Sequence, residues 1–178
     1  MSLYEPLAQA FAAGHAREIP DLLSDAQFAR DGRATPAAVL IAITDVPHDP
    51  QVILTQRPRA MRDHPGQVAF PGGKIDPGED AFATAKRELL EETGHTAREW
   101  RHLGVMHPCV GYSDERIEIF LARGLHHETT QKLDHGEFLD VFEMTLENAL
   151  LAVQQGKITD AKTITGLFWA EKILNSGW

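Results

Sequence analysis

One 23-residue segment, from Gly73 to His95, constrains the fold more than any other part of the chain; its sequence is GKIDPGEDAFATAKRELLEETGH. Asp80 is a residue type that accepts a hydrogen bond from the first turn of a helix, and Gly94 is the type that most often ends one. The apolar residues between them recur at helical spacing, at Phe82, Ala85 and Leu89. The segment therefore predicts a helix over residues 80–93 that packs one apolar face against a sheet.

The same helix places three carboxylates on another face. Glu88, Glu91 and Glu92 lie at helical spacings of three and four residues, so their side chains project from one side. Like charges this close repel one another, whereas a hard divalent cation such as Mg²⁺ prefers carboxylate oxygens. Arg87 precedes Glu91 by one helical turn and can hold that carboxylate in place. The pattern favours a metal-binding helix.

A short acidic run by itself is more often a solvated surface. Here the glutamates belong to a longer pattern of seven fixed positions, which begins at Gly73, includes Glu79 and ends at Gly94. At about 7% per residue type, the chance of that pattern in one window is on the order of 10⁻⁸. The spacing therefore favours a metal-binding helix over a solvated acidic surface.

The segment resembles the Nudix box, and the chain looks like a Nudix hydrolase. The residues that match are Gly73, Glu79, Arg87, Glu88, Leu89, Glu91, Glu92 and Gly94, while His95 stands where the family usually has an aliphatic residue. The resemblance implies an α/β/α sandwich with a mixed central β-sheet. It also implies hydrolysis of a diphosphate linked to another moiety, with water and Mg²⁺ or Mn²⁺.

The resemblance assigns roles within the box. Glu88, Glu92 and the backbone carbonyl of Gly73 would be metal ligands, and Glu91 would be a further ligand or would orient the water. Arg87, Glu91 and Glu92 are the catalytic candidates from this helix.

The composition limits which other classes of protein the chain can belong to. The chain has 178 residues and a net charge of −9, which fits one domain and argues against binding to nucleic acid or an anionic membrane. A single cysteine, Cys109, excludes an internal disulfide and a cysteine-based zinc site. The longest apolar run, residues 37–43, is far shorter than the ~18 residues of a membrane span, and no secretory signal is visible. We expect a cytoplasmic protein.

We expect a helical leader over residues 1–33 and a Nudix domain over residues 34–178. Hydrophobic patterning predicts strands at 36–43 and 52–55, joined as a hairpin, and further strands at 68–70, 102–107, 116–122 and 139–144. Residues 116–122 alternate in a way that suggests a sheet with one fairly polar face. Helices are expected at 146–155 and 160–174.

The segment before the box resembles the coenzyme A diphosphatase subfamily. The matching residues run from Ile53 to Arg57, include Arg62, and end in Gly66-Gln-Val-Ala-Phe-Pro-Gly-Gly73, with Pro58 as a departure. Basic residues are frequent in this loop and could hold an additional phosphate. The substrate-binding candidates here are Arg57, Arg62, Gly72 and Gly73.

The segment after the box resembles bacterial ADP-ribose diphosphatases instead. The match includes residues 111–122, 134–138 and 156–163, although Val110 stands where that subfamily usually has proline. It makes Tyr112 a substrate-binding candidate and Glu137 a catalytic-base candidate. The N-terminal β-domain of that subfamily has no counterpart in the first 35 residues. The two resemblances together suggest a mosaic chain, natural or engineered, with a seam near residues 73–79.

The sequence therefore predicts a diphosphatase that acts on an ADP-containing, nucleoside diphosphate-linked small molecule. Coenzyme A, giving 3′,5′-ADP and 4′-phosphopantetheine, is favoured over ADP-ribose, giving AMP and ribose 5-phosphate, because its motif adjoins the box. A catalytically silent Nudix-fold binding module is the alternative of another class. The oligomeric state is left open, with a homodimer as one outcome.

Overall fold

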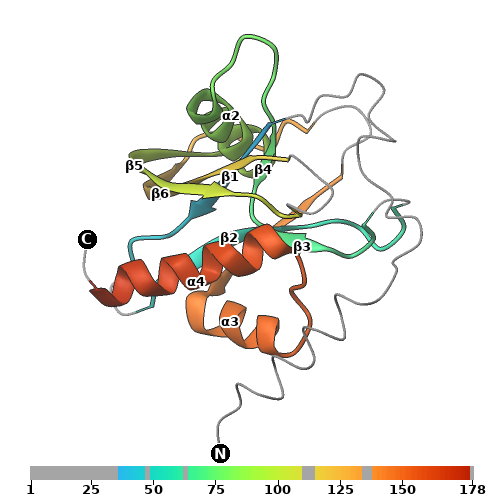
Figure 1. Ribbon diagram of the computed structural model, residues 1–178, viewed down its shortest axis with the longest axis vertical. Coiled ribbons are helices and arrows are strands. Elements are labelled where there is room, and N and C mark those ends of the chain that lie inside the picture. The colour runs from blue at the N-terminus through green and yellow to red at the C-terminus, as the bar shows by residue number, and fades with distance from the viewer. Residues whose placement is uncertain (1–35, 47–48, 62–63, 110–114, 134–137, 177–178) are drawn as a thin grey trace, which may run out of the picture.

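The computed structural model describes residues 36–46, 49–61, 64–109, 115–133 and 138–176 (Figure 1). The predicted helical leader over residues 1–33 lies outside this part. The strands are β1 (Ala37–Ala42), β2 (Gln51–Gln56), β3 (Val68–Ala69), β4 (Gly72–Lys74), β5 (His95–Met106), β6 (Ile117–His127) and β7 (Asp140–Thr145). The helices are α2 (Ala81–Thr93), α3 (Leu146–Gln154) and α4 (Ala161–Ser176).

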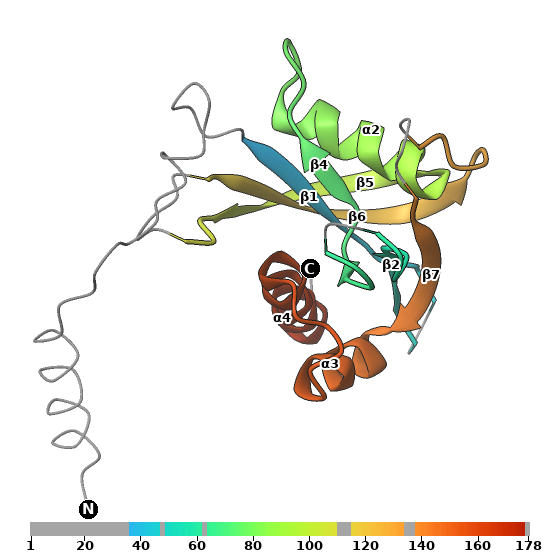
Figure 2. The same cartoon turned by 90° about the vertical axis from the view of Figure 1, so that its right-hand side faces the viewer.

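Two sheets form the middle of the molecule. The larger has four strands in the order β4-β1-β6-β5, and it is mixed because β1 runs parallel to β6 and antiparallel to β4. The smaller is antiparallel, in the order β3-β2-β7. Helix α2 covers one side of the larger sheet, and α3 and α4 lie on the other side (Figure 2). The predicted α/β/α sandwich with a mixed sheet is confirmed.

Strand β1 occupies the centre because its side chains are apolar on both faces. Ala38, Leu40 and Ala42 pack with Ala85 and Leu89 of α2. The alternate residues Val39 and Ile41 pack on the opposite face, in the core that α4 covers. The sheet is therefore sandwiched between two cores, and its small residues face the helix that bears the carboxylates.

The predicted pairing of the first two strands and the predicted polar face of 116–122 are wrong. The expected hairpin between the first two strands is absent, because β1 and β2 meet at one isolated bridge, between Ile43 and Val52, and belong to different sheets. The expected polar face of β6 is absent too, because residues 117–122 are all buried. Glu118 is buried there as an ion-paired residue, with its carboxylate 2.6 Å from His102 Nε2 and 2.7 Å from Arg116 Nη2.

The three helices predicted from residue 80 onward are confirmed to within one or two residues. The expected apolar face of α2 is buried at Ala85 and Leu89, whereas Phe82 is 38% exposed and packs edge-on against Trp100. Among the helices of the described residues, none is long and apolar enough to cross a membrane.

Candidate active site

Helix α2 is fixed at both ends by the residues that predicted it. The Asp80 side chain accepts a hydrogen bond of 2.7 Å from the Ala83 N–H, and the Gly94 N–H donates to the Leu90 carbonyl. Gly94 has φ of 72°, and a side chain there would collide with the Thr129 carbonyl, so glycine is required. These caps set the helical phase that brings Glu88, Glu91 and Glu92 to one side.

Two glycines let β4 pack closely against its neighbours, Gly72 against strand β1 and Gly73 against helix α2. A Cβ at Gly72 would lie 2.5 Å from the Ala38 carbonyl oxygen, and one at Gly73 would lie 2.7 Å from the carboxyl carbon of Glu88. Because Gly73 has no side chain, the Glu88 carboxylate rests directly against its backbone. The predicted ligands Gly73 and Glu88, far apart in sequence, are thus neighbours in the structure.

The Glu92 side chain is anchored by a hydrogen bond from the backbone of β4. This side chain is buried, and Oε2 accepts a hydrogen bond of 3.1 Å from the Gly72 N–H. The backbone carbonyl of Glu92 accepts a hydrogen bond from the side chain of Gln131, which also donates to the Leu139 carbonyl. Gln131 and Leu139, which lie on either side of the segment 134–137, are therefore linked by hydrogen bonds to the C-terminal end of α2, where Glu92 lies.

Arg87 links the acidic residues into one network. Nη1 donates to Glu88 Oε1 and Glu91 Oε2, at 3.0 Å each, and Nε donates to Glu79 Oε1 at 3.1 Å. The bond to Glu91 is the predicted contact; the bonds to Glu79 and Glu88 were not predicted. One guanidinium thus offsets the repulsion among carboxylates that the sequence places side by side.

The network shifts the proton affinities of its members. Partial burial alone lowers the pKa of Arg87, but its hydrogen bonds with Glu79 and Glu91 outweigh burial and raise that pKa above its ordinary value. Hydrogen bonds from Arg87 and from the Thr84 hydroxyl, which lies 2.8 Å away, hold the pKa of Glu79 below 4.5. Glu79 is therefore a carboxylate at neutral pH that positions Arg87.

The donor set fits a divalent cation. Glu88, Glu91 and Glu92 supply carboxylate oxygens, and the Gly73 backbone against which Glu88 rests can supply a carbonyl oxygen. Among the described residues, no three His, Cys, Asp or Glu side chains are already gathered as a metal-binding group. In this arrangement Glu88 and Glu91 share Arg87, and Glu92 accepts from Gly72. These donors suit a divalent cation because they are hard oxygen ligands and because they all come from the junction of α2 and β4.

The remaining predicted site residues divide into two groups. Arg57 is half-buried at the end of β2, and its N–H donates to the Gln67 carbonyl, which closes the loop that leads through β3 to Gly72. The others, Arg62, Tyr112 and Glu137, lie outside the described residues. Sequence reasoning missed Thr84 and Gln131, because neither residue type carries a spacing that points to a carboxylate or a helix end.

Three kinds of comparison with known proteins show what the chain is similar to: a family model, curated relatives and a solved structure. A family model described as "NUDIX domain" matches residues 34–165. An ADP-ribose pyrophosphatase from Bacillus subtilis is 37% identical over 128 residues, which cover 71% of this chain and 67% of that protein. An "Uncharacterized Nudix hydrolase NudL" from Klebsiella pneumoniae is 36% identical over 149 residues, covering 78% of this chain and 74% of that protein. The crystal structure of an ADP compounds hydrolase superposes with a TM-score of 0.66 at 25% identity, covering 81% of this chain and 76% of that one.

These matches do not support a mosaic. An alignment that covers 71% or 78% of a 178-residue chain must cross residues 73–79, where the seam was expected. Each relative thus resembles the chain on both sides of the box. We therefore see no support for a junction between two subfamilies.

Proposed function

The chain belongs to the Nudix family of pyrophosphohydrolases, and we propose that it hydrolyses the diphosphate bond of ADP-ribose to AMP and ribose 5-phosphate. The observation that carries this choice is the match to the Bacillus subtilis ADP-ribose pyrophosphatase, which runs through the box and well beyond it. The sequence had favoured coenzyme A, and the relatives favour ADP-ribose instead. The downstream resemblance around Tyr112 and Glu137 agrees with this substrate.

The box residues suit the chemistry of such a bond. Glu88, Glu91, Glu92 and the Gly73 carbonyl would hold Mg²⁺ or Mn²⁺, which when bound neutralises diphosphate charge and favours ionisation of water. Arg87 would keep the Glu88 and Glu91 carboxylates together and charged. The anchoring of Glu92 to Gly72 would fix its position relative to β4.

We assign the base role to Glu137. The water oxygen would bond to one phosphorus while the bond from that phosphorus to the bridging oxygen breaks. The bridging oxygen and its electron pair would leave with the other phosphate, and the water proton would pass to the Glu137 carboxylate. Support comes from Gln131, whose side-chain bonds to the Glu92 and Leu139 carbonyls bring both flanks of that segment to α2. The N–H of Lys132 also donates to the Glu91 carbonyl, at 2.8 Å.

Coenzyme A remains the second candidate for one reason. The loop between β2 and β3 carries Arg57, Arg59 and His64, and it leads directly into Gly72. Arginine side chains bind phosphate well, and coenzyme A carries an extra 3′-phosphate.

Product analysis separates the two substrates. The purified chain is incubated with Mg²⁺ and either ADP-ribose or coenzyme A, and the products are resolved by chromatography. Turnover of ADP-ribose to AMP at the higher kcat/KM supports the proposal, and preferential release of 3′,5′-ADP from coenzyme A overturns it. Glu92→Gln, prepared identically, controls for contaminating hydrolases. Turnover of neither substrate, with Mn²⁺ tried as well, would support the silent binding module instead.

A further inference from the structure

A second hollow lies away from the glutamates of α2, where helix α4 passes the edge strand β5. Its volume is about 260 Å³, and it is lined by Arg101, His102, Leu103, Trp169, Lys172 and Ile173. We call it the β5–α4 hollow. Helix α4 lies across the sheet face opposite α2, so this hollow and the acidic face of α2 belong to different layers (Figures 1 and 2).

The β5–α4 hollow has an aromatic and aliphatic floor. Trp169 packs over the backbone of Gly104, where a Cβ would lie only 3.4 Å from the indole. Leu103 and Ile173 are half-buried beside it and join the same core. A half-buried indole with aliphatic neighbours offers a surface on which a flat ring can pack.

The rim of the hollow is cationic. Arg101 and Lys172 are exposed and come from opposite walls, one on β5 and one on α4. The His102 ring is already engaged elsewhere, since its Nε2 lies 2.6 Å from the Glu118 carboxylate. Among the described residues, no aspartate or glutamate lines the hollow. The hollow therefore combines two cations with an apolar floor, although the chain as a whole has a net charge of −9.

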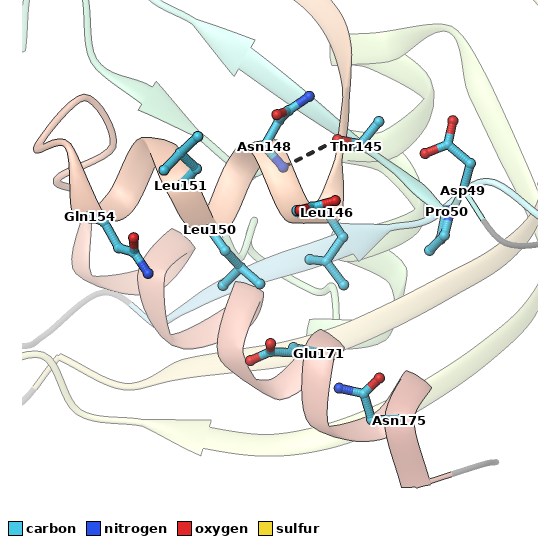
Figure 3. A pocket seen from close by; sticks show the side chains of 11 residues that line it. Asp49, Pro50, Thr145, Leu146, Asn148, Leu150, Leu151, Gln154, Glu171 and Asn175 are labelled. Carbon is cyan, nitrogen blue, oxygen red and sulfur yellow. Dashed lines mark hydrogen bonds between the residues drawn. The ribbon is translucent and has the colours of Figure 1, made fainter.

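A larger hollow on the other side of α4 shows the opposite chemistry. It has a volume of about 500 Å³ and lies between α3 and α4, where Asp49, Glu147 and Glu171 line it together with amide side chains (Figure 3). No lysine or arginine lines it in the part of the chain that the structure describes. Glu171 and Lys172 are neighbours in sequence but line different hollows. Helix α4 thus contributes Glu171 to the hollow beside α3, and Lys172 and Trp169 to the hollow beside β5.

We propose that the β5–α4 hollow binds a nucleoside monophosphate, with the base on Trp169 and the phosphate between Arg101 and Lys172. Two cations match a phosphate dianion better than a single carboxylate. The volume lies just below the roughly 300–1,000 Å³ of sites for drug-sized ligands, which suits a mononucleotide and not an enclosed dinucleotide. This inference does not depend on which diphosphate the α2 site hydrolyses.

Binding of AMP to the full chain tests the proposal. Calorimetry with divalent ions chelated compares AMP with adenosine and with inorganic phosphate, because chelation weakens phosphate binding at the α2 site. We expect saturable AMP binding at or below about 1 mM, and at least tenfold weaker binding of either fragment. If inorganic phosphate bound as tightly as AMP, Trp169 would have no role in binding. If adenosine bound as tightly as AMP, Arg101 and Lys172 would have none. Either result would overturn the proposal.

Variants locate the ligand. Lys172→Gln should weaken AMP binding about tenfold, whereas Lys157→Gln, which removes the same charge from an exposed loop position, should leave the affinity within twofold. Trp169→Leu should weaken AMP but leave any phosphate binding unchanged, and thermal melts verify that each variant is folded. AMP affinity unchanged in both Lys172→Gln and Trp169→Leu would place the nucleotide elsewhere and refute the site.

Discussion

Replacing Gly73 with alanine should separate catalysis from stability. The added Cβ would lie 2.7 Å from the Glu88 carboxyl carbon, which is 0.7 Å inside the 3.4 Å at which ordinary contact begins. The clash is with the far end of a flexible side chain, so Glu88 can swing away and the fold loses less than the ~1–3 kcal/mol of a rigid overpacked core. The predicted metal ligand, however, leaves its position beside the Gly73 carbonyl.

The expected loss of activity follows from that displacement. Because a misplacement of about 1 Å costs ~10²-fold in rate, we expect kcat to fall by roughly that factor while the midpoint of thermal unfolding changes by only a few degrees. Steady-state kinetics and a thermal melt on the same preparation measure both quantities.

Gly72→Ala is the matched control for this substitution. There the Cβ would meet backbone, 2.5 Å from the Ala38 oxygen, and φ of 154° disfavours any side chain, so stability should fall first. The reasoning would be refuted if Gly73→Ala kept kcat within threefold of the wild type. It would also be refuted if Gly73→Ala unfolded as readily as Gly72→Ala.

Three further predictions address the carboxylates. Glu92→Gln should keep the bond to the Gly72 N–H through its amide oxygen and remain folded, yet lose about 10³-fold or more in kcat; a loss below tenfold would exclude Glu92 as a metal ligand. Glu137→Gln should lower kcat with little change in KM if it is the base, and an unchanged kcat would return that role to the box. Glu79→Gln should destabilise the fold at neutral pH. The pKa of Glu79 is depressed in the folded state, so this contribution is present above pH 4.5 and disappears as the pH falls through the folded pKa. Urea denaturation at pH 7 and near pH 3 measures the difference, and a pH-independent gap would contradict the ion pair with Arg87.

The parts of the structure that sequence predicts well are those set by local chemistry. Helix α2 begins after Asp80 and ends before Gly94 as expected, because both ends are determined by the capping residues themselves. The contact between Arg87 and Glu91 follows in the same way from one helical turn.

The failures concern strand pairing and burial, which local sequence patterns do not determine. Burial of Glu118 depends on His102 and Arg116, and an alternating pattern alone cannot reveal that a buried glutamate is neutralised by neighbouring side chains. The β1–β2 hairpin was expected from their adjacency, but β1 pairs with β6 across a long stretch of sequence. Strand β5 was expected only from residue 102, since its first half is polar along an edge of the sheet.

The role of Arg87 explains how an acidic helix can exist before any metal binds. Glu79, Glu88 and Glu91 all accept hydrogen bonds from one guanidinium, which shields their mutual repulsion inside the protein. Glu79 and Arg87 strengthen each other as charged groups, as the opposite shifts of their pKa values indicate. Replacing Arg87 with lysine would keep the charge but could not serve three carboxylates in fixed directions. The box therefore needs arginine for geometry as well as charge, and Glu79 belongs to the pattern because it orients that arginine.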